Sequence, residues 1–494
     1  MKNLKRKLEL YEQLFRMFGP GESRCQIAQL ASLWHVTERY VFTLLRAMEE
    51  SGWINWQASS GRNKHASLEC RVEPMDACYE AAEQLAQLGQ VDELLKALSF
   101  GGRDAGKELQ IFLNSSNPST QQIVYIPFHR AIEPLHPHKV LRRTERFLVM
   151  QTYQRLTAVV NNKLEGDLAY HWESNSNGTV WTFQVRNNIQ FHDGHPLSTQ
   201  DIVRSLEGLV AHRYWAGCYQ HVESITAISN NVIEVKLNQT DWHLPRMFAK
   251  AEASIFRYGA LLSPVGSGAF SLDVFSTNML RLNSNPLYSH RAPILDRVEV
   301  WFYPDWAVSK QCSHNQLRLQ MPENTITVDS DFPATFMLLS NPLLPKESRI
   351  VAVEDTSDAQ QLFAQTAQKG DGAFKIDYGD YHATKDALLC SIIEEDDYYT
   401  AWLSLFLRFP FKALNLADDM FVAIQSWLEA IRSEPDVEKS LSQLNELRTW
   451  LNEQQIMTEL KHENFRLEVS ERLKGSAVDG FGWCQLSQLW INQD

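Results

Sequence analysis

The first chemically suggestive feature of this chain is a set of basic and polar side chains at helical spacing. They lie within ten residues of one another: Thr37, Arg39, Tyr40, Thr43 and Arg46. Arginine can pair bidentately with guanine, and threonine can contact a base edge or the methyl group of thymine. Arg62 and Lys64 follow in ASSGRNKH and could contact phosphates, which fix position without reading sequence. The pattern predicts contacts with double-stranded DNA.

A helix-turn-helix would place these side chains together. Apolar residues recur every three or four positions over 4–18, 24–33 and 38–50, and Thr37 suits the N-cap of the third helix. Strand-like segments at 53–57 and 66–72 flank the basic ASSGRNKH tip. This order predicts a winged helix-turn-helix, a fold that presents its second helix to the major groove. Because winged helices also bind proteins, protein recognition stays open as the alternative.

Residues that could serve catalysis or bind metal are present but poorly arranged. His192, Asp193 and His195 have ligand chemistry, yet HDGHP is typical of a turn beside a strand. The acidic run at 394–397 is expected to be a solvated loop, because adjacent carboxylates do not face one substrate. The chain has neither a GxxxxGK(S/T) nor a GxSxG motif. We therefore expect no enzyme, no metal and no cofactor.

Charge divides the chain into a small basic part and a large acidic part. Residues 1–75 hold 11 Lys and Arg against 8 Asp and Glu, whereas the remainder holds 36 against 52, within a total net charge of −13. A length of 494 residues suggests two or three domains. We predict a DNA-binding domain at 1–75, a helical connector at 76–118 and a sensor domain at 119–494.

Nothing in the hydrophobic pattern indicates a membrane. The N-terminal MKNLKRKLELYEQLFRMF lacks an uninterrupted apolar run of the length a signal peptide needs. The apolar segment at 401–411 is short and is broken by Arg408 and Pro410. Seven scattered cysteines without a CxxC pair suit a reducing compartment. These features predict a cytoplasmic protein with no membrane partner.

One stretch of the acidic part carries a specific resemblance. LEGDLAYHWE at 164–173 and WTFQVRNNIQFHDGHPLSTQDIVRSLEGL at 181–209 are similar to the signature of the peptide- and nickel-binding family of extracellular solute-binding proteins. SPVGSGAFSL at 263–272 resembles a further motif of that family. The resemblance implies a two-lobed α/β, periplasmic-binding-protein-like fold (type II, family 5), joined here to the winged helix as a multidomain chain.

The combination of the two domains is itself a resemblance. The GW..W and GRN features at 52–63 and the closing DGFGWCQLSQLW at 479–490 are similar to the SgrR-like family of transcriptional regulators. The resemblance implies a cytoplasmic DNA-binding regulator that senses a small metabolite, a sugar phosphate or a peptide, and that could act as a homodimer. The alternative is a cytoplasmic solute or peptide receptor whose winged helix binds protein. A hydrolase on the same scaffold is a third class, but the chain offers it no nucleophile.

The fold implied by this resemblance also suggests where a ligand would bind. Phe128 and Arg130 follow the first buried strand, at the position where such folds meet their ligands, and Trp402 lies on a later apolar segment. Arginine suits a phosphate or carboxylate. The competing interpretation is that Arg130 pairs with a local acid such as Glu133 and that Trp402 belongs to the core.

Overall fold

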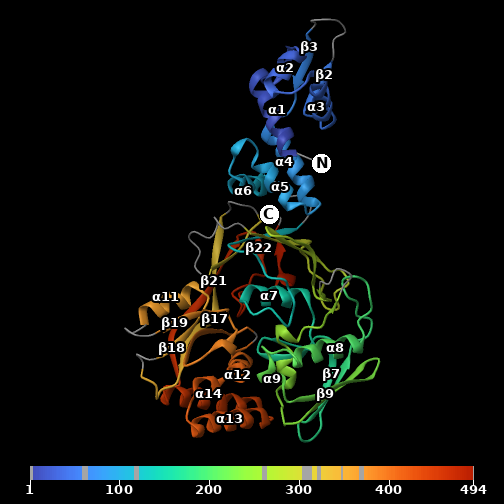
Figure 1. Ribbon diagram of the computed structural model, residues 1–494. Coiled ribbons are helices and arrows are strands. Elements are labelled where there is room, and N and C mark those ends of the chain that lie inside the picture. The colour runs from blue at the N-terminus through green and yellow to red at the C-terminus, as the bar shows by residue number, and fades with distance from the viewer. Residues whose placement is uncertain are drawn as a thin grey trace.

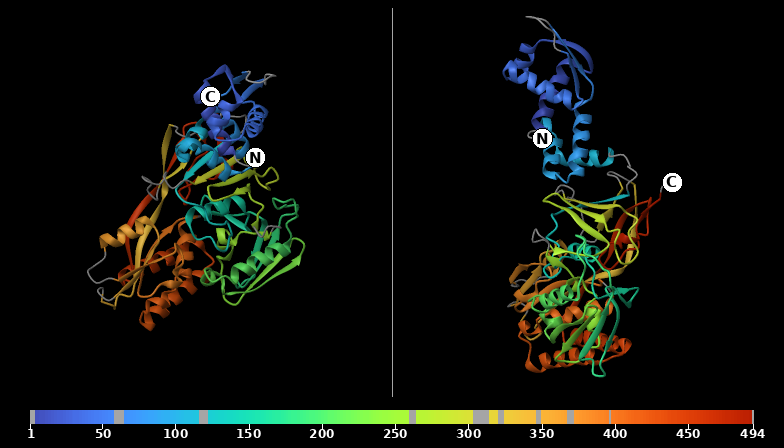
Figure 2. Two further views of the ribbon diagram at one scale, coloured as in Figure 1. Left: turned by 45° about the horizontal axis from the view of Figure 1, so that its top comes forward. Right: turned by 90° about the vertical axis from the view of Figure 1, so that its right-hand side faces the viewer.

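The computed structural model describes residues 4–57, 65–115, 122–258, 264–302, 314–319, 324–345, 349–366, 372–395 and 397–492. A small head, coloured blue in Figure 1, stands on a helical connector above a larger body with two lobes. The right-hand view of Figure 2 shows the head projecting from one end of the body, with the connector between them.

The head is a winged helix-turn-helix. Its elements are α1 (Leu4–Phe18), β1 (Gly21–Cys25), α2 (Ile27–Trp34), α3 (Glu38–Glu50), β2 (Ile54–Gln57) and β3 (Ala66–Cys70). The strands form an antiparallel sheet in the order β1-β3-β2. The sequence prediction missed β1 and started the second helix too early, at 24, because the five-residue strand GESRC has no alternating apolar pattern.

Three helices form the connector: α4 (Pro74–Gln87), α5 (Val91–Leu98) and α6 (Ala105–Ser115). Their apolar faces join the head in one continuous core, which includes Leu8, Leu45, Leu85 and Leu94. An ion pair between the buried Glu12 of α1 and the partly buried Arg103, with an N–O distance of 2.6 Å, adds to this contact. The head and the predicted helical connector therefore share one core.

The first lobe of the body, lobe I, contains two four-stranded sheets. One has the order β13-β14-β15-β4, with β4 parallel to β15 and the other pairs antiparallel. The other is β7-β8-β10-β9, covered by α8. The elements of the first sheet and the helix after it are β4 (Ile123–Phe128), α7 (Arg143–Thr152), β13 (Phe270–Phe275), β14 (Met279–Ser284) and β15 (Arg297–Phe302). Those of the second are β7 (Ala169–Ser174), β8 (Val180–Val185), α8 (Thr199–Val210), β9 (Val222–Ser229) and β10 (Val232–Leu237).

Short elements complete lobe I. The hairpin of β5 (Thr157–Val160) and β6 (Lys163–Gly166) precedes the second sheet. The remainder are α9 (Ala216–Tyr219), α10 (Leu244–Met247), β11 (Arg257–Tyr258) and β12 (Pro264–Val265). The start of α8 is a capping box, in which the side chains of Ser198 and Asp201 accept hydrogen bonds from each other's backbone N–H groups. This cap fixes the start of the helix that follows the HDGHP turn.

Lobe II is built on a six-stranded mixed sheet in the order β16-β21-β17-β20-β18-β19. Its strands are β16 (His314–Leu317), β17 (Thr325–Ser340), β18 (Ile350–Glu354), β19 (Gly372–Ile376), β20 (Ala387–Ile393) and β21 (Met457–Ser470). Its helices are α11 (Ser357–Thr366), α12 (Tyr398–Arg408), α13 (Asp418–Ser433) and α14 (Val437–Glu453). The chain then closes with the short pair β22 (Leu473–Lys474) and β23 (Trp490–Ile491), where Trp483 stacks on Phe147 of α7.

Candidate nucleic-acid interface and ligand cavity

Helix α3 is positioned by a defined start and a buried face. The hydroxyl of Thr37 accepts a hydrogen bond from the Tyr40 backbone N–H at 3.4 Å, as an N-cap does. Val41, Leu44, Leu45 and Met48 are buried in the core of the head. The opposite side of the helix faces solvent, and the predicted contact residues on it are all exposed: Arg39, Tyr40, Thr43 and Arg46.

The exposed residues of α3 divide between two surfaces. Tyr40 and Thr43 line a groove of about 590 Å³ between α1, α3 and α4, which Lys7 and Glu80 also line. Arg39 and Arg46 do not line it. Arg46 bonds Glu50 at 3.2 Å, but both side chains are largely exposed, so the pair is weak.

Phe42 was not singled out from the sequence, although its side chain is 46% exposed. It lies three residues after Arg39 and four before Arg46, which places all three on one side of the helix. This spacing was the available signal, but an apolar residue in a helix is ordinarily assigned to the core. Arg62 and Lys64 lie outside the described residues, so their predicted role stays a prediction.

A cavity of about 410 Å³ lies between the lobes. Its lobe I wall comes from the end of β4 and the start of α7 and carries Arg130, Arg142 and Arg143. Its lobe II wall comes from β17, β20 and β21 of the six-stranded sheet and from the segment after β18, and it carries three carboxylates, from Asp355, Asp358 and Glu463. The cavity therefore has a cationic wall on one lobe and an acidic wall on the other.

Phe128 and Arg130 both line this cavity. The guanidinium of Arg130 forms two hydrogen bonds with the Glu145 carboxylate of α7, at 2.5 and 2.8 Å. The local acid that was considered, Glu133, pairs instead with Arg142 at 3.2 Å. Arg130 pairs with Glu145 and not with Glu133 because the Glu145 side chain is fully buried on α7. A buried carboxylate needs a fixed bidentate partner to offset the cost of its desolvation.

Trp402 lies away from the cavity. Its side chain is fully buried in the core of lobe II, and the Arg448 guanidinium covers its ring at 4.0 Å from the centroid. Trp402 is therefore a core residue, and it is not part of the proposed ligand site. Both faces of α12 are apolar and buried, so the sequence could not show which of its aromatic rings would reach a surface.

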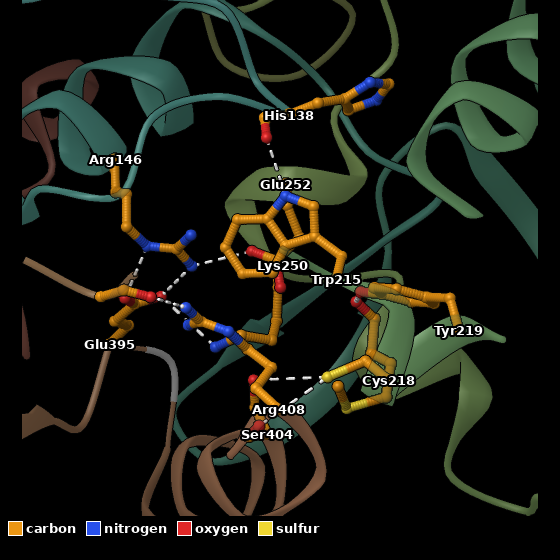
Figure 3. A network of polar contacts seen from close by, with 12 residues as sticks. His138, Arg146, Trp215, Cys218, Tyr219, Lys250, Glu252, Glu395, Ser404 and Arg408 are labelled. Carbon is orange, nitrogen blue, oxygen red and sulfur yellow. Dashed lines mark hydrogen bonds and ion pairs between the residues drawn. The ribbon is translucent and has the colours of Figure 1, made fainter. Parts of the chain in front are cut away.

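Buried charges join the two lobes near the cavity (Figure 3). Arg146 of α7 contacts Glu395 of lobe II at 2.5 Å and Glu252 of lobe I at 2.8 Å, and Lys250 contacts Glu395 at 3.3 Å. Burial disfavours ionisation of Glu395, but the charges of Arg146 and Lys250 outweigh it and lower its pKa to about 2. The predicted solvated acidic loop is wrong for this residue.

The same is true of Asp397, at the other end of the acidic run. It caps α12 by accepting the Thr400 N–H at 2.6 Å, and it pairs with Arg246 of lobe I at 2.6 Å. The run of four acids looked like a surface loop because the cationic partners of Glu395 and Asp397 are about 150 to 250 residues away along the chain: Arg146, Lys250 and Arg246. Only the contact between the lobes brings them together.

Glu354, at the end of β18, is fully buried and forms no ion pair with any residue that the structure describes. Its carboxylate accepts hydrogen bonds from the Ser391 N–H at 2.9 Å, the Ser391 hydroxyl at 3.1 Å and the Gly379 N–H at 3.2 Å. Burial raises its pKa to about 7, against the effect of these hydrogen bonds. Because Ser391 also lines the cavity, Glu354 is a titratable group directly behind the lobe II wall.

The histidines that were considered as metal ligands have other contacts. The His192 ring nitrogen Nε2 lies 3.0 Å from the Gly268 carbonyl oxygen, and Asp193 pairs with Arg257. In the described part of the chain, no group of three or more His, Cys, Asp or Glu side chains is arranged to hold a metal ion. Nor is any helix among those residues long and apolar enough to cross a membrane.

Comparisons with known proteins identify both parts of the chain. Residues 6–119 match the sugar transport-related sRNA regulator N-terminal family, and residues 163–316 match the middle region of the bacterial extracellular solute-binding proteins, family 5. The uncharacterized protein YbaE of Escherichia coli K12 is 28% identical over 64% of this chain and 57% of its own length. The HTH-type transcriptional regulator SgrR of the same strain is 28% identical over 60% of this chain and 55% of its own length. The chain thus matches little more than half the length of these relatives.

Solved structures support the fold of the body, including lobe II. The Helicobacter pylori periplasmic binding protein DppA, in complex with the peptide STSA, has a TM-score of 0.59 at 14% identity and covers 75% of this chain. NikA from Brucella suis, in complex with Fe(III)-EDTA, has a TM-score of 0.59 at 11% identity with the same coverage. Each is matched over nearly its whole length, 98% and 100%. The two-lobed, periplasmic-binding-protein-like fold predicted from the sequence is confirmed, and the chain joins a region similar to the SgrR-type N-terminal family to a region similar to the family 5 solute-binding proteins.

Proposed function

We propose that this protein is a DNA-binding transcriptional regulator whose body senses a small molecule in the cavity between its lobes. The observation that carries the proposal is the exposed face of α3, which has a capped start and two outward arginines, on a chain similar to proteins named as HTH-type regulators. Regulation of transcription places it in the cytoplasm. The alternative, a receptor whose head binds protein, would use the same helix.

In this proposal Arg39 and Arg46 read base edges in the major groove. Tyr40 and Thr43, on the side of α3 that faces α4, contact the DNA at the edge of the bound site. Thr37 fixes the start of the helix, and Arg62 and Lys64 of the wing contact phosphates. If the protein binds as a homodimer, the half-sites should lie about 34 Å apart, one turn of DNA.

Selection of genomic DNA fragments by the purified protein, followed by titration at several salt concentrations, tests DNA binding. We expect selective retention of a few fragments, with an affinity that falls steeply as salt rises because counterions are released from the neutralised phosphates. Retention of no fragment above background, at any salt concentration, would refute DNA binding and favour the protein-binding alternative.

The effector is proposed to bind between the arginines of lobe I and the carboxylates of lobe II, in contact with Phe128 and Arg130. A sugar phosphate and a peptide both remain candidates. The acidic wall favours a ligand that carries a cationic group as well as an anionic one, because a dianion alone would face three carboxylates. A ligand of this kind would bridge the lobes and favour their closed arrangement.

Thermal shifts with matched pairs of compounds test this assignment. Glucosamine 6-phosphate and glucose 6-phosphate differ by one amine, as do a dipeptide and its N-acetyl derivative. A bound ligand at 100 times its dissociation constant adds about 2.7 kcal/mol. We expect the amine-bearing member of one pair to give the larger shift. Equal shifts within both pairs would contradict a role for the acidic wall, and no shift with any of the four would contradict the proposed effector classes.

A further inference from the structure

A buried arginine of the body caps a helix of the connector. Arg281 lies on β14, is 1% exposed, and donates hydrogen bonds to the carbonyl oxygens of Ala86 and of Gln87, the latter at 3.3 Å. These are the last two residues of α4, whose carbonyl groups have no N–H partner four residues further along the helix, although the Ala86 carbonyl also accepts the Gly89 N–H at 3.0 Å. A positive charge at this end also suits the helix dipole. The body therefore holds the connector by the C-terminus of α4.

Glu299 of β15 fixes the capping arginine in place. Its carboxylate accepts hydrogen bonds from Arg281 Nε at 3.0 Å and from the Trp301 indole N–H at 3.0 Å. Arg281 and Glu299 face each other in the register of β14 and β15, and we call them the capping pair. Since the carboxylate is itself held by the indole, the guanidinium has one defined direction.

The apolar surroundings of the capping pair continue into the head. Met279 and Trp301 flank it on β14 and β15 and belong to the same core as the helices of the head and the connector. In the turn after α4, Gly89 approaches β13 so closely that an added Cβ would lie 2.6 Å from Val274 Cγ2. Because α1 in turn packs on α4 and α5, a displacement of the C-terminus of α4 would move the head with it.

The strands that carry the capping pair also reach the ligand cavity. Phe302 of β15 pairs with Phe128 of β4, a residue of the cavity wall, and the preceding Trp301 pairs with Pro127. Because β15 is the direct neighbour of β4 in the sheet, a shift of β4 at the cavity would also move Trp301 and the capping pair. Packed strands transmit such shifts because the interior is dense and deforms little.

We propose that the capping pair is the joint through which the interlobe cavity acts on the DNA-binding head. Arg281 and Glu299 fix the C-terminus of α4 to the sheet that forms the cavity wall, so that a change at the cavity alters the stability and position of the connector. The regulatory role of this joint rests on the proposed function, whereas its anchoring role does not.

The anchoring role is tested by amide hydrogen exchange in the full-length protein, without ligand or DNA. The variant Arg281→Met/Glu299→Gln removes the cap without leaving an unpaired buried charge. We expect exchange within residues 85–98 to become about tenfold faster, since hydrogen bonds to a charged group are lost, while α8 keeps its protection. The control is Asp273→Asn, because Asp273 is a partly exposed residue 3.7 Å from Arg281. Unchanged exchange within 85–98 in the double variant would overturn the proposal.

The transmission is tested by filling the cavity through mutation. Ala334→Leu enlarges a buried side chain of the lobe II wall and so stands in for an occupant. We expect it to change exchange within 85–98 by about threefold or more when the capping pair is intact, and not at all in the double variant. The proposal is refuted if Ala334→Leu has no effect on this segment with the pair intact, or the same effect without it.

Failure of the capping-pair proposal can be distinguished from failure of the proposed function. Loss of selective DNA retention with an intact exchange response would refute DNA regulation but leave the joint in place. Selective DNA retention with no exchange response would do the reverse.

Discussion

At the scale of single residues, the two outward arginines of α3 can be tested against a cation elsewhere. Arg39→Ala and Arg46→Ala should each weaken binding to a selected fragment by about 1–3 kcal/mol and relax the preference for one base pair, because a bidentate contact is lost. Lys96→Ala is the control, since Lys96 is an exposed connector residue that pairs with Glu93 on the same helix. Titration of the fragment and of its single-base variants measures both effects. Equal losses for all three variants would contradict a specific role for α3.

Glu354 predicts a pH dependence of stability. Its pKa is about 7 in the folded protein and near 4.5 when unfolded, so the folded state binds the proton more tightly. The resulting stabilisation is present below about pH 4.5 and is lost as the pH rises through 7. Between pH 4 and 8, wild type should therefore lose about 3 kcal/mol more than Glu354→Gln, which cannot ionise.

Urea unfolding of both proteins at several pH values measures this difference. Asp355→Asn serves as the control, because Asp355 is an exposed neighbour in the chain. Parallel pH profiles for wild type and Glu354→Gln would show that the pKa of Glu354 is the same in the folded and unfolded protein, and so would contradict the prediction.

At the scale of elements, the turn between α4 and α5 is expected to be sensitive to any added side chain. Gly89 has a φ of +67°, and an added Cβ would overlap Val274 of β13. Gly102 has a φ of +79° with no neighbour within 4 Å, so Gly102→Ala reports the backbone strain alone. Gly89→Ala should cost more than Gly102→Ala by about 1–3 kcal/mol in urea unfolding, because it also pushes the connector off the sheet. Equal costs would mean that Val274 moves aside freely.

Elements with strong local signals could be predicted from the sequence. Helix α3 was expected at 38–50 and spans Glu38–Glu50, because Thr37 caps it and its apolar residues keep a 3.6-residue period. Strand β1 was missed because its sequence is mostly polar and its partner, β3, lies more than 40 residues away. Strand pairing between distant segments leaves little trace in a short window of sequence.

At the scale of the whole molecule, the contact between the lobes depends on the buried charges around Glu395. Glu395→Gln should destabilise the protein by about 3–5 kcal/mol, because Arg146 and Lys250 would lose their shared anionic partner in a buried site. Glu394→Gln is the matched control, since Glu394 is the adjacent carboxylate and lacks these two partners among the described ion pairs. Chemical denaturation compares the two variants, and equal costs would contradict the assigned importance of the network.

The sequence by itself determined the winged helix and the two-lobed body, because these depend on local periodicity, capping residues and a long motif at 164–209. Tertiary structure alone decided which charges meet. It paired Arg130 with Glu145, moved Trp402 into the core, buried Glu395 between the lobes and placed Arg281 at the end of α4. The reason is physical: a helix period constrains neighbours within a few residues, whereas a buried ion pair depends on the packing of segments that can be 100 to 250 residues apart.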